Sequence, residues 1–331
     1  MENSPRVKMA DVAARAGVSL ATVSKVVNAR YGVAPGTIEK VKAVIEELGY
    51  VENLGASSLC RSTSNVLGVL VADFEPFSAE LLKGAASAVH GTRFEVLAHA
   101  GGEAQAWERR SLSRLGGTLI DGAIIVTPTV LDAWDGIPVV AIDPHYGPNS
   151  LPTIDADSYA GAKELTAYLI GLGHTRIAML GGREELDSAR LREAGFRDAM
   201  GAAGIRVDEE LVRATRFQPD TAREIAHSLL TMPTPPTAIF AANDSTALRA
   251  LDAALELGLD VPGDVSIAGF DDVPDAALSN PRLTTVRQPL QEMGRVAMEM
   301  LMDLVAGKPR ERHIRMDVSL VARESTAPPR T

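Results

Sequence analysis

The stretch Met9-Ala-Asp-Val-Ala-Ala-Arg-Ala-Gly-Val-Ser-Leu-Ala-Thr-Val-Ser-Lys-Val-Val-Asn28 is typical of two short helices joined by a tight turn. The first helix carries an apolar stripe at helical spacing, formed by Met9, Val12, Ala13 and Ala16. Gly17 can adopt the left-handed conformation that ends a helix, and Ser19 can cap the next one. The buried face of the second helix is expected to consist of Val23, Val26 and Val27. The pattern predicts a helix-turn-helix, whose second helix enters a DNA major groove.

A third helix is indicated by Pro35 at a first-turn position and by Gly49 at the end of the pattern. Its apolar face is expected to contain Ile38, Val41, Ile45 and Leu48. An ordinary helical hairpin would share the tight turn of the first two helices. The three-helix unit, together with a small and polar outer face on the second helix, favours a DNA-binding module.

Charge is distributed unevenly along the chain of 331 residues, a length that predicts two or three domains. Residues 1–62 carry eight Lys and Arg against six Asp and Glu, whereas the chain as a whole has a net charge of −10. An acidic body repels DNA, so nucleic acid must be held by the N-terminal module. Because the excess positive charge there is small, we expect affinity to depend on two such modules acting together.

The sequence lacks the features of a secreted or membrane-spanning protein. Cys60 is the single cysteine, which excludes an intramolecular disulfide framework and suits a reducing compartment. The N-terminus has no apolar segment of signal-peptide length, and no run approaches the roughly 18 apolar residues that span a bilayer. We therefore expect a cytoplasmic protein without membrane contact.

Beyond residue 65, short apolar runs alternate with helical segments. The runs are Val66–Val71, Phe94–Leu97, Gly122–Val126, Pro138–Asp143, Arg176–Leu180, Ala238–Ala242 and Val265–Phe270. Nearly continuous apolar strands separated by helices predict parallel sheets covered on both faces, and hence an α/β fold. The rhythm occurs twice, over about 63–160 and 161–288, which predicts two doubly wound lobes. Ligands of such sheets bind beyond the carboxyl ends of the strands, here in the cleft between the lobes.

An enzyme on the same fold is the main alternative for this body, but the sequence carries no catalytic pattern. It has no G-x-S-x-G elbow, no H-E-x-x-H, no phosphate-binding G-x-x-x-x-G-K and no paired metal-ligand spacing. The six histidines are scattered, and His174 lies in a helix-to-strand connection. We therefore expect no catalysis, no metal site and no cofactor.

Specific motifs resemble the lactose-repressor (LacI-type) family of bacterial transcription regulators along almost the whole chain. In the N-terminal module these are Asp11-Val-Ala to Gly17-Val-Ser, Thr22-Val-Ser-Lys-Val-Val-Asn28 and Glu47-Leu-Gly-Tyr50. In the body they are Asp157–Ala162, Leu172–Ile177, Ser188–Phe196, Pro236–Asp244, Pro262–Asp272 and Leu283–Pro289.

The resemblance implies three parts. These are a helix-turn-helix headpiece over 1–52, a hinge over 53–62 and a core over 63–331 that is similar to periplasmic sugar-binding proteins. The N-terminal lobe of the core would comprise about 63–160 plus 290–325, and the C-terminal lobe about 161–288. The chain would cross between the lobes three times, and a strand near Val318–Ser325 would return to the N-terminal lobe.

The resemblance also assigns candidate effector-binding residues. Arg192, Asn243 and Asp271 match positions that hold a polyol, since they offer a bidentate fork, an amide and two acceptor oxygens. Phe217 matches a stacking aromatic. The further candidates are Asp73, Phe74, Phe77, Asp143, Ser188 and Gln288. Alternatives remain for some of these residues: Asp271 lies in a good turn sequence, Arg192 suits a solvated helix face, and Phe74 and Phe77 suit core packing.

On the DNA side, the matching positions divide into base-reading, backbone-contacting and hinge residues. Leu20, Ala21 and Lys25 match base-reading positions, and Lys25 can reach guanine acceptors. Positions that mostly hold phosphates are matched by Ser19, Thr22, Ser24 and Asn28. In the segment Asn53–Cys60, Leu59 matches a leucine that wedges into the minor groove, with Ala56 beside it.

Three residues depart from the family pattern. Lys8 replaces a helix-capping Ser or Thr, which costs about 1 kcal/mol. Glu52 replaces a frequent proline before the hinge, and Gly55 weakens a hinge helix by roughly 1 kcal/mol relative to alanine. These departures bear on how well the hinge orders.

Together these features predict a homodimeric, ligand-responsive repressor of carbohydrate-utilisation genes that a sugar effector releases from a pseudo-palindromic operator. Two-fold symmetry of a dimer would present two recognition helices to two half-sites. The alternatives are a co-repressed, purine-type regulator of the same family and a solute-binding protein. The identity of the effector and the operator sequence are left open.

Overall fold

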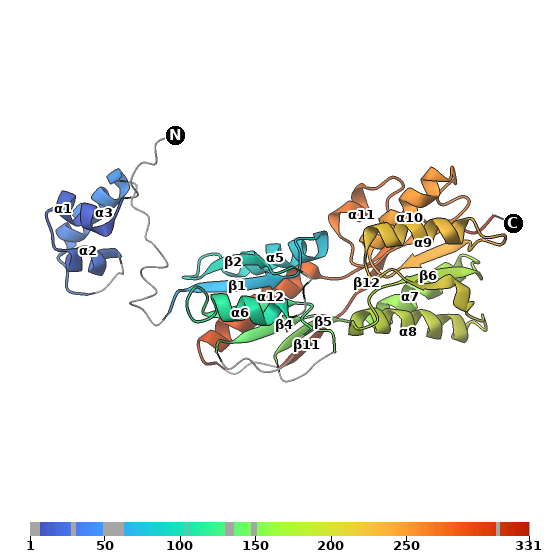
Figure 1. Cartoon of the computed structure of the whole chain (residues 1–331), viewed down its shortest axis with the longest axis horizontal. Helices are drawn as coiled ribbons and strands as arrows, with labels where there is room; N and C mark the ends of the chain where they lie inside the picture. Colours follow the sequence, from blue (N-terminus) through green and yellow to red (C-terminus); the bar gives the residue numbers. More distant parts are fainter. Residues whose placement is uncertain are drawn as a thin grey trace. The chain divides into compact units, whose positions relative to one another are not determined.

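The computed structural model of the chain describes residues 7–27, 31–48, 63–102, 104, 106–129, 136–146, 151–308 and 312–330. It divides into two compact units, Met1–Ser64 and Asn65–Thr331 (Figure 1). Among the described residues, no helix combines the length and apolar character needed to cross a bilayer. We call the described part of the first unit the headpiece and the second unit the core.

The headpiece contains the three predicted helices, α1 (Met9–Ala16), α2 (Leu20–Val27) and α3 (Pro35–Leu48). Its centre is formed by side chains with no solvent exposure, Val12, Ala16, Val23 and Val41. Gly17 ends α1 with φ at 63°, and the Ser19 hydroxyl accepts the Thr22 backbone N–H at 3.1 Å. The expected helix-turn-helix is confirmed. The start of α1 has no hydroxyl cap. It is stabilised instead by the Asp11 carboxylate, which accepts the Lys8 backbone N–H at 2.7 Å.

The N-terminal lobe of the core is built on six parallel strands in the order β11-β5-β4-β3-β1-β2. Their bounds are β1 (Val66–Val71), β2 (Glu95–Ala100), β3 (Gly122–Val126), β4 (Val139–Ile142), β5 (Thr153–Ala156) and β11 (His313–Met316). Helices α5 (Pro76–Ala88) and α12 (Leu290–Val305) pack on one face of this sheet, with Leu81 and Met298 in the shared apolar cluster. Helix α6 (Trp107–Leu115) covers the other face.

The C-terminal lobe has four parallel strands in the order β7-β6-β8-β9, with helices on both faces (Figure 1). The strands are β6 (Ile177–Gly181), β7 (Val212–Ala214), β8 (Ala238–Ala241) and β9 (Ser266–Ala268). One face is covered by α7 (Ser158–Gly171) and α8 (Asp187–Ala202), the other by α9 (Pro219–Leu230) and α10 (Asp244–Glu256). The short helices η1 (Glu209–Leu211) and α11 (Pro274–Leu278) complete the lobe. The predicted pair of doubly wound lobes is thereby confirmed.

One expected strand is placed differently from the sequence prediction. The strand that pairs with β5 in the N-terminal lobe is β11, which precedes the predicted segment Val318–Ser325. Strand β12 (Ser319–Val321) instead pairs antiparallel with β10 (Thr285–Arg287), and the Ser325 carbonyl accepts the Ile267 N–H of the C-terminal lobe at 2.8 Å. The prediction was wrong because Leu320 finds its apolar partners in the C-terminal lobe.

Two glycines allow α5 and α12 to cross at very short range. A Cβ atom on Gly84 would lie 1.8 Å from the carbonyl oxygen of Gln291, and one on Gly294 would lie 2.0 Å from the carbonyl oxygen of Leu81. Both neighbours are backbone atoms, so neither can move without shifting a helix. The packing of these two helices on the N-terminal sheet therefore requires glycine at both positions.

We predict that Gly84→Ala and Gly294→Ala each lower the free energy of unfolding of the core by roughly 1–3 kcal/mol, because the added methyl forces the helices apart. The matched control is Gly201→Ala, on α8, where nothing lies within 4 Å of the added Cβ. That substitution should raise stability by about 0.5–1 kcal/mol, since alanine costs less entropy in a helix. The measurement is urea unfolding of the three variants. Equal effects of Gly84→Ala and Gly201→Ala would contradict the close crossing.

Candidate functional site

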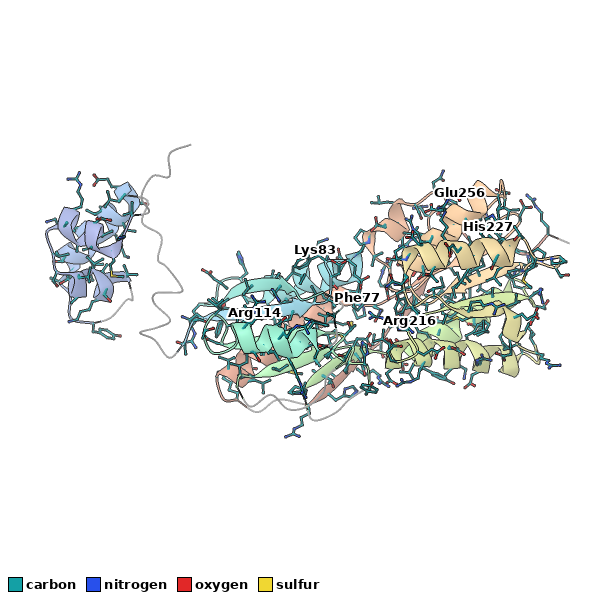
Figure 2. The ribbon with its side chains drawn as sticks, viewed as in Figure 1. Phe77, Lys83, Arg114, Arg216, His227 and Glu256 are labelled. Atoms are coloured by element: carbon teal, nitrogen blue, oxygen red, sulfur yellow. The ribbon has the colours of Figure 1, made fainter. Side chains whose placement is uncertain are left out.

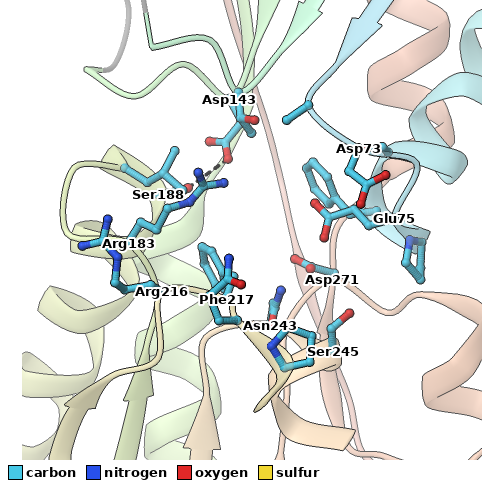
Figure 3. Close-up of a pocket in the computed structure, with 18 of the residues that line it drawn as sticks. Asp73, Glu75, Asp143, Arg183, Ser188, Arg216, Phe217, Asn243, Ser245 and Asp271 are labelled. Carbon is cyan, nitrogen blue, oxygen red and sulfur yellow. Dashed lines mark hydrogen bonds between the residues drawn. The ribbon is translucent and has the colours of Figure 1, made fainter. Parts of the chain in front are cut away.

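A cavity of about 340 Å³ lies between the two lobes of the core, at the carboxyl ends of both sheets. Each lobe contributes the loops that directly follow its strands. In the N-terminal lobe these place Asp73 and Glu75 after β1, Thr127 after β3 and Asp143 after β4, and Phe77 is added from the first turn of α5. In the C-terminal lobe they place Arg183 after β6, Arg216 and Phe217 after β7, Asn243 after β8 and Asp271 after β9 (Figure 3). The volume suits a small-molecule ligand.

Most of the candidate effector-binding residues line this cavity. They are Asp73, Phe77, Asp143, Ser188, Arg192, Phe217, Asn243 and Asp271. Figure 2 labels Phe77 and Arg216, which come from different lobes and lie where the lobes meet. Gln288 is buried behind the wall and donates its side-chain N–H to an Asp271 carboxylate oxygen at 2.6 Å.

Phe74 does not line the cavity, contrary to the sequence prediction. Its side chain is 53% exposed and it is not among the lining residues, whereas Phe77, which lies farther along the same segment, is. The Asp73 carboxylate accepts the Phe74 N–H at 2.7 Å, in a local turn ahead of α5. This turn brings Asp73 and Phe77 to the cavity and directs Phe74 to solvent.

Arg192 and Asp271 form a buried ion pair in the cavity wall. Their side chains are 4% and 6% exposed, and an Arg192 guanidinium nitrogen lies 3.5 Å from an Asp271 carboxylate oxygen. The same nitrogen donates to the Ala242 carbonyl, and the guanidinium lies 3.9 Å from the centre of the Phe270 ring. Arg192 is therefore held from several sides, which rules out the alternative of a solvated helix residue.

Burial changes the protonation of two carboxyl groups at this site. Desolvation raises the pKa of Asp271 to about 7, although the Arg192 charge and the Gln288 hydrogen bond oppose the rise. Desolvation also raises the pKa of Asp143, against the opposing effects of Arg192 and of the Ser188 hydroxyl. Near neutral pH Asp271 can therefore respond to a ligand by gaining or losing a proton.

Unusual backbone conformations concentrate around the cavity. The lining residues with positive φ are Thr127 (47°), Asp143 (49°), Arg216 (56°), Phe217 (60°) and Asp271 (115°). Each of these backbone conformations costs on the order of 1–3 kcal/mol, and residues of this kind cluster at ligand-binding sites. The Phe217 ring lies directly on Gly182, where a Cβ atom would come 2.2 Å from the ring. The strained loop after β7 thus presents a fixed aromatic face.

Several residues that line the cavity were not predicted from the sequence, notably Glu75, Thr127, Arg183, Arg216, Gln218 and Ser245. All six stand within a few residues of the end of a strand. Their position after strands was the available signal, but charged and polar residues are ordinary in loops. Within the described part of the chain, no group of three or more His, Cys, Asp or Glu is arranged to hold a metal ion.

Two hydrogen bonds join the lobes at one rim of the cavity. The Ser188 hydroxyl of α8 donates to the Asp143 carboxylate at 2.9 Å, and the Asp187 N–H donates to the His145 carbonyl at 2.9 Å. Asp143 and His145 follow β4 of the N-terminal lobe, whereas Asp187 and Ser188 begin α8 of the C-terminal lobe. The angle between the lobes is therefore tied to residues that also line the cavity.

In the headpiece, α2 separates its two faces clearly. Val23 is fully buried against α1 and α3, whereas Leu20 is 53% exposed, and Ala21 and Lys25 are also exposed. The hydroxyls of Ser19 and Thr22 lie 2.8 Å apart at the start of the helix, and Ser24 is half-buried. Of the candidate DNA-binding residues, Asn28, Asn53, Ala56 and Leu59 lie outside the described residues, and their roles stay predictions.

Known proteins match both units. The family model described as bacterial regulatory proteins, lacI family, matches residues 8–53, and a periplasmic binding protein-like domain matches residues 166–326. The HTH-type transcriptional repressor PurR of Photobacterium profundum is 33% identical over 327 residues, covering 95% of this chain and 97% of PurR.

Two solved structures extend the match. The transcriptional regulator CelR–cellobiose complex has a TM-score of 0.71 at 31% identity, covering 97% of this chain and 100% of the other. The lac repressor dimer bound to operator and the anti-inducer ONPF has a TM-score of 0.83 at 29% identity, covering 97% and 99%. The chain therefore belongs to the LacI family of bacterial transcriptional regulators.

Proposed function

We propose that this chain is a homodimeric repressor of carbohydrate-utilisation genes, which a sugar effector in the core cavity releases from a pseudo-palindromic operator. The observation that carries the proposal is the composition of the cavity wall. It combines carboxylate, amide and hydroxyl groups with two phenyl rings, as a polyol with polar edges and an apolar face requires. The chain then acts in the cytoplasm as a regulator rather than as an enzyme.

The sugar is expected to lie against Phe217, whose ring is fixed by Gly182 and by its own strained backbone. Asp271 supplies acceptor oxygens for hydroxyl groups. Asn243 supplies its side-chain amide N–H, because its side-chain oxygen already accepts the Thr246 N–H at 2.9 Å as the cap of α10. Arg192 holds Asp271 in place and offers its remaining N–H groups. The structure of CelR with cellobiose supports a sugar as the ligand class.

The headpiece is expected to place α2 in the major groove, with Leu20, Ala21 and Lys25 toward the base edges. This assignment rests on the exposure of these side chains opposite the buried Val23. A dimer supplies a second recognition helix related by two-fold symmetry, as the operator complex of the lac repressor dimer supports.

A second candidate is a co-repressed regulator of the purine type, favoured by the 33% identity to a repressor named PurR. The Phe217 ring could equally stack on a planar base. The two candidates differ in the sign of the effector response, since a co-repressor tightens operator binding and an inducer weakens it.

We predict that a sugar effector lowers operator affinity 5–150-fold, which corresponds to a coupling free energy of about 1–3 kcal/mol. Operator must then weaken effector binding by the same factor. Asp271→Asn should abolish the response while leaving operator affinity unchanged, and Asp275→Asn, at an exposed position, should behave as the parent chain. Operator titration at fixed salt with and without a sugar panel tests this. A nucleobase that tightens operator binding would establish the second candidate instead.

Lys25→Ala should weaken operator binding by about 1–3 kcal/mol and relax specificity at one base pair of each half-site. Lys42→Ala, on the exposed surface of α3, removes the same charge and is the matched control. Gel-shift titration against operator variants measures both effects. If the two substitutions weaken binding equally at every sequence, Lys25 contributes only non-specific charge.

Effector affinity should rise with pH through about 7, the pKa to which burial raises Asp271. Hydroxyl groups of a sugar donate to the ionised carboxylate, so binding favours the charged form and releases a proton. The affinity should therefore increase by up to about tenfold per pH unit below 7 and level off above it. Calorimetry from pH 5.5 to 8.5 measures this slope, which Asp271→Asn should flatten. A wild-type slope of the opposite sign would mean that the ligand accepts a hydrogen bond from protonated Asp271.

A further inference from the structure

Arg183 contributes a positive charge to the cavity wall. It lines the cavity, yet among the described residues its side chain has no ion-pair or hydrogen-bond partner, and its Nε atom is buried without one. A buried guanidinium nitrogen without an acceptor costs free energy, because its hydration is lost and nothing replaces it. A ligand with acceptor oxygens would supply the missing partner.

A second guanidinium stands on the same wall. Arg216 lines the cavity next to Arg183, and Figure 3 shows the two labelled on the side opposite Asp73 and Glu75. Among the described residues, the Arg216 side chain pairs with Glu185 at 3.0 Å, and the Arg216 side chain is 60% exposed. Such a pair is worth little, so Arg216 can exchange Glu185 for a ligand.

The backbone that carries Arg216 toward the cavity has a strained conformation. Arg216 and Phe217 are consecutive residues in the left-handed region, with φ at 56° and 60°. Gln218 and Pro219, which follow directly at the start of the twelve-residue helix α9, also line the cavity. The positive end of that helix adds to the attraction for a negative charge.

The positive charge of Arg192, by contrast, already has a buried anionic partner. It contacts the Ala242 carbonyl, the Asp271 carboxylate and the Phe270 ring, and these contacts account for its charge. A neutral sugar would satisfy the side of the cavity with Asn243 and Asp271 and would leave the charge of Arg183 without an anionic partner.

We propose that the effector is an acidic sugar, whose carboxylate or phosphate group is bound by Arg183 and Arg216 while its hydroxyl groups face Asn243 and Asp271. The planar guanidinium groups match either anion in a bidentate manner. This inference rests on the proposed function as a sugar-responsive regulator and adds the charge of the ligand.

The carboxylates of the cavity do not oppose such a ligand at the arginine wall. Asp73 and Glu75 lie on the opposite side (Figure 3). The Asp271 charge is shared with Arg192, and Asp143 accepts the Ser188 hydroxyl. The cavity is thus polarised, with a cationic side and an acidic side, and a ligand with one anionic end fits this polarity.

The test is calorimetry of the full chain at fixed ionic strength with matched sugars. Each set contains a neutral hexose, its uronate and its 6-phosphate, in the gluco, galacto and manno configurations. At least one acidic member should bind at least tenfold more tightly than its neutral parent, and the set shows whether carboxylate or phosphate is preferred. Arg183→Gln should remove that preference, Arg183→Lys should retain part of it, and Arg249→Gln, in an exposed pair on α10, should leave it unchanged.

The inference is overturned if the neutral member binds as tightly as the acidic ones in every set, or if Arg183→Gln keeps the acidic preference. Operator titration with the same compounds separates this failure from that of the proposed function. Release of operator by a neutral sugar would retain the sugar-responsive regulator and remove the acidic effector. No response to any sugar, with tightening by a nucleobase, would remove both.

Discussion

The buried carboxylate of Asp271 joins three parts of the core that must move together. It follows β9 and pairs with Arg192 of α8, and it accepts the side-chain N–H of Gln288, which follows β10 on the path back to the N-terminal lobe. Its backbone N–H also donates to the Val286 carbonyl at 2.8 Å. A charge in this position is costly unless every contact is made. A ligand that changes the hydrogen bonding of Asp271 therefore acts on the sheet, the helix and the crossing segment at once.

Most of the strands that the sequence predicted are buried on both faces, and the exception is β2, whose end residues are exposed. In β1, β3 and β4 every residue is buried, so a continuous apolar run marked each of them. Strand β11 was missed because its pattern is mixed: Arg315 pairs with the Asp155 carboxylate of β5 at 2.9 Å, a partner 160 residues away. Strand β7 has three residues, two of them exposed, and no local pattern distinguishes it from a loop. Long-range pairing decides these strands, and a single sequence does not contain that information.

The residues of the cavity likewise divide into those that the sequence predicts and those that it does not. Asn243 and Asp271 could be identified because they end apolar strands within specific motifs, and both line the cavity. Phe74 and Phe77 are of the same type and lie in the same segment, so only the turn at Asp73 decides which ring reaches the cavity. Arg183 could not be found at all, because an arginine in a loop is usually solvated. Its importance follows from an atom that the fold leaves buried without a partner.

The hydrogen bonds between the lobes contribute about as much free energy as the coupling between an effector and a second site requires. The hydrogen bonds from Ser188 to Asp143 and from Asp187 to the His145 carbonyl hold one rim of the cavity. Each contributes about 0.5–1.5 kcal/mol net, so together they are comparable to the 1–3 kcal/mol by which effectors usually couple to a second site. A ligand that binds Asp143 competes with Ser188 for the same carboxylate. Its binding can therefore break one hydrogen bond between the lobes and form one with the ligand instead. If these contacts were much stronger the lobe angle would be fixed, and if they were much weaker the ligand would have no defined state to change.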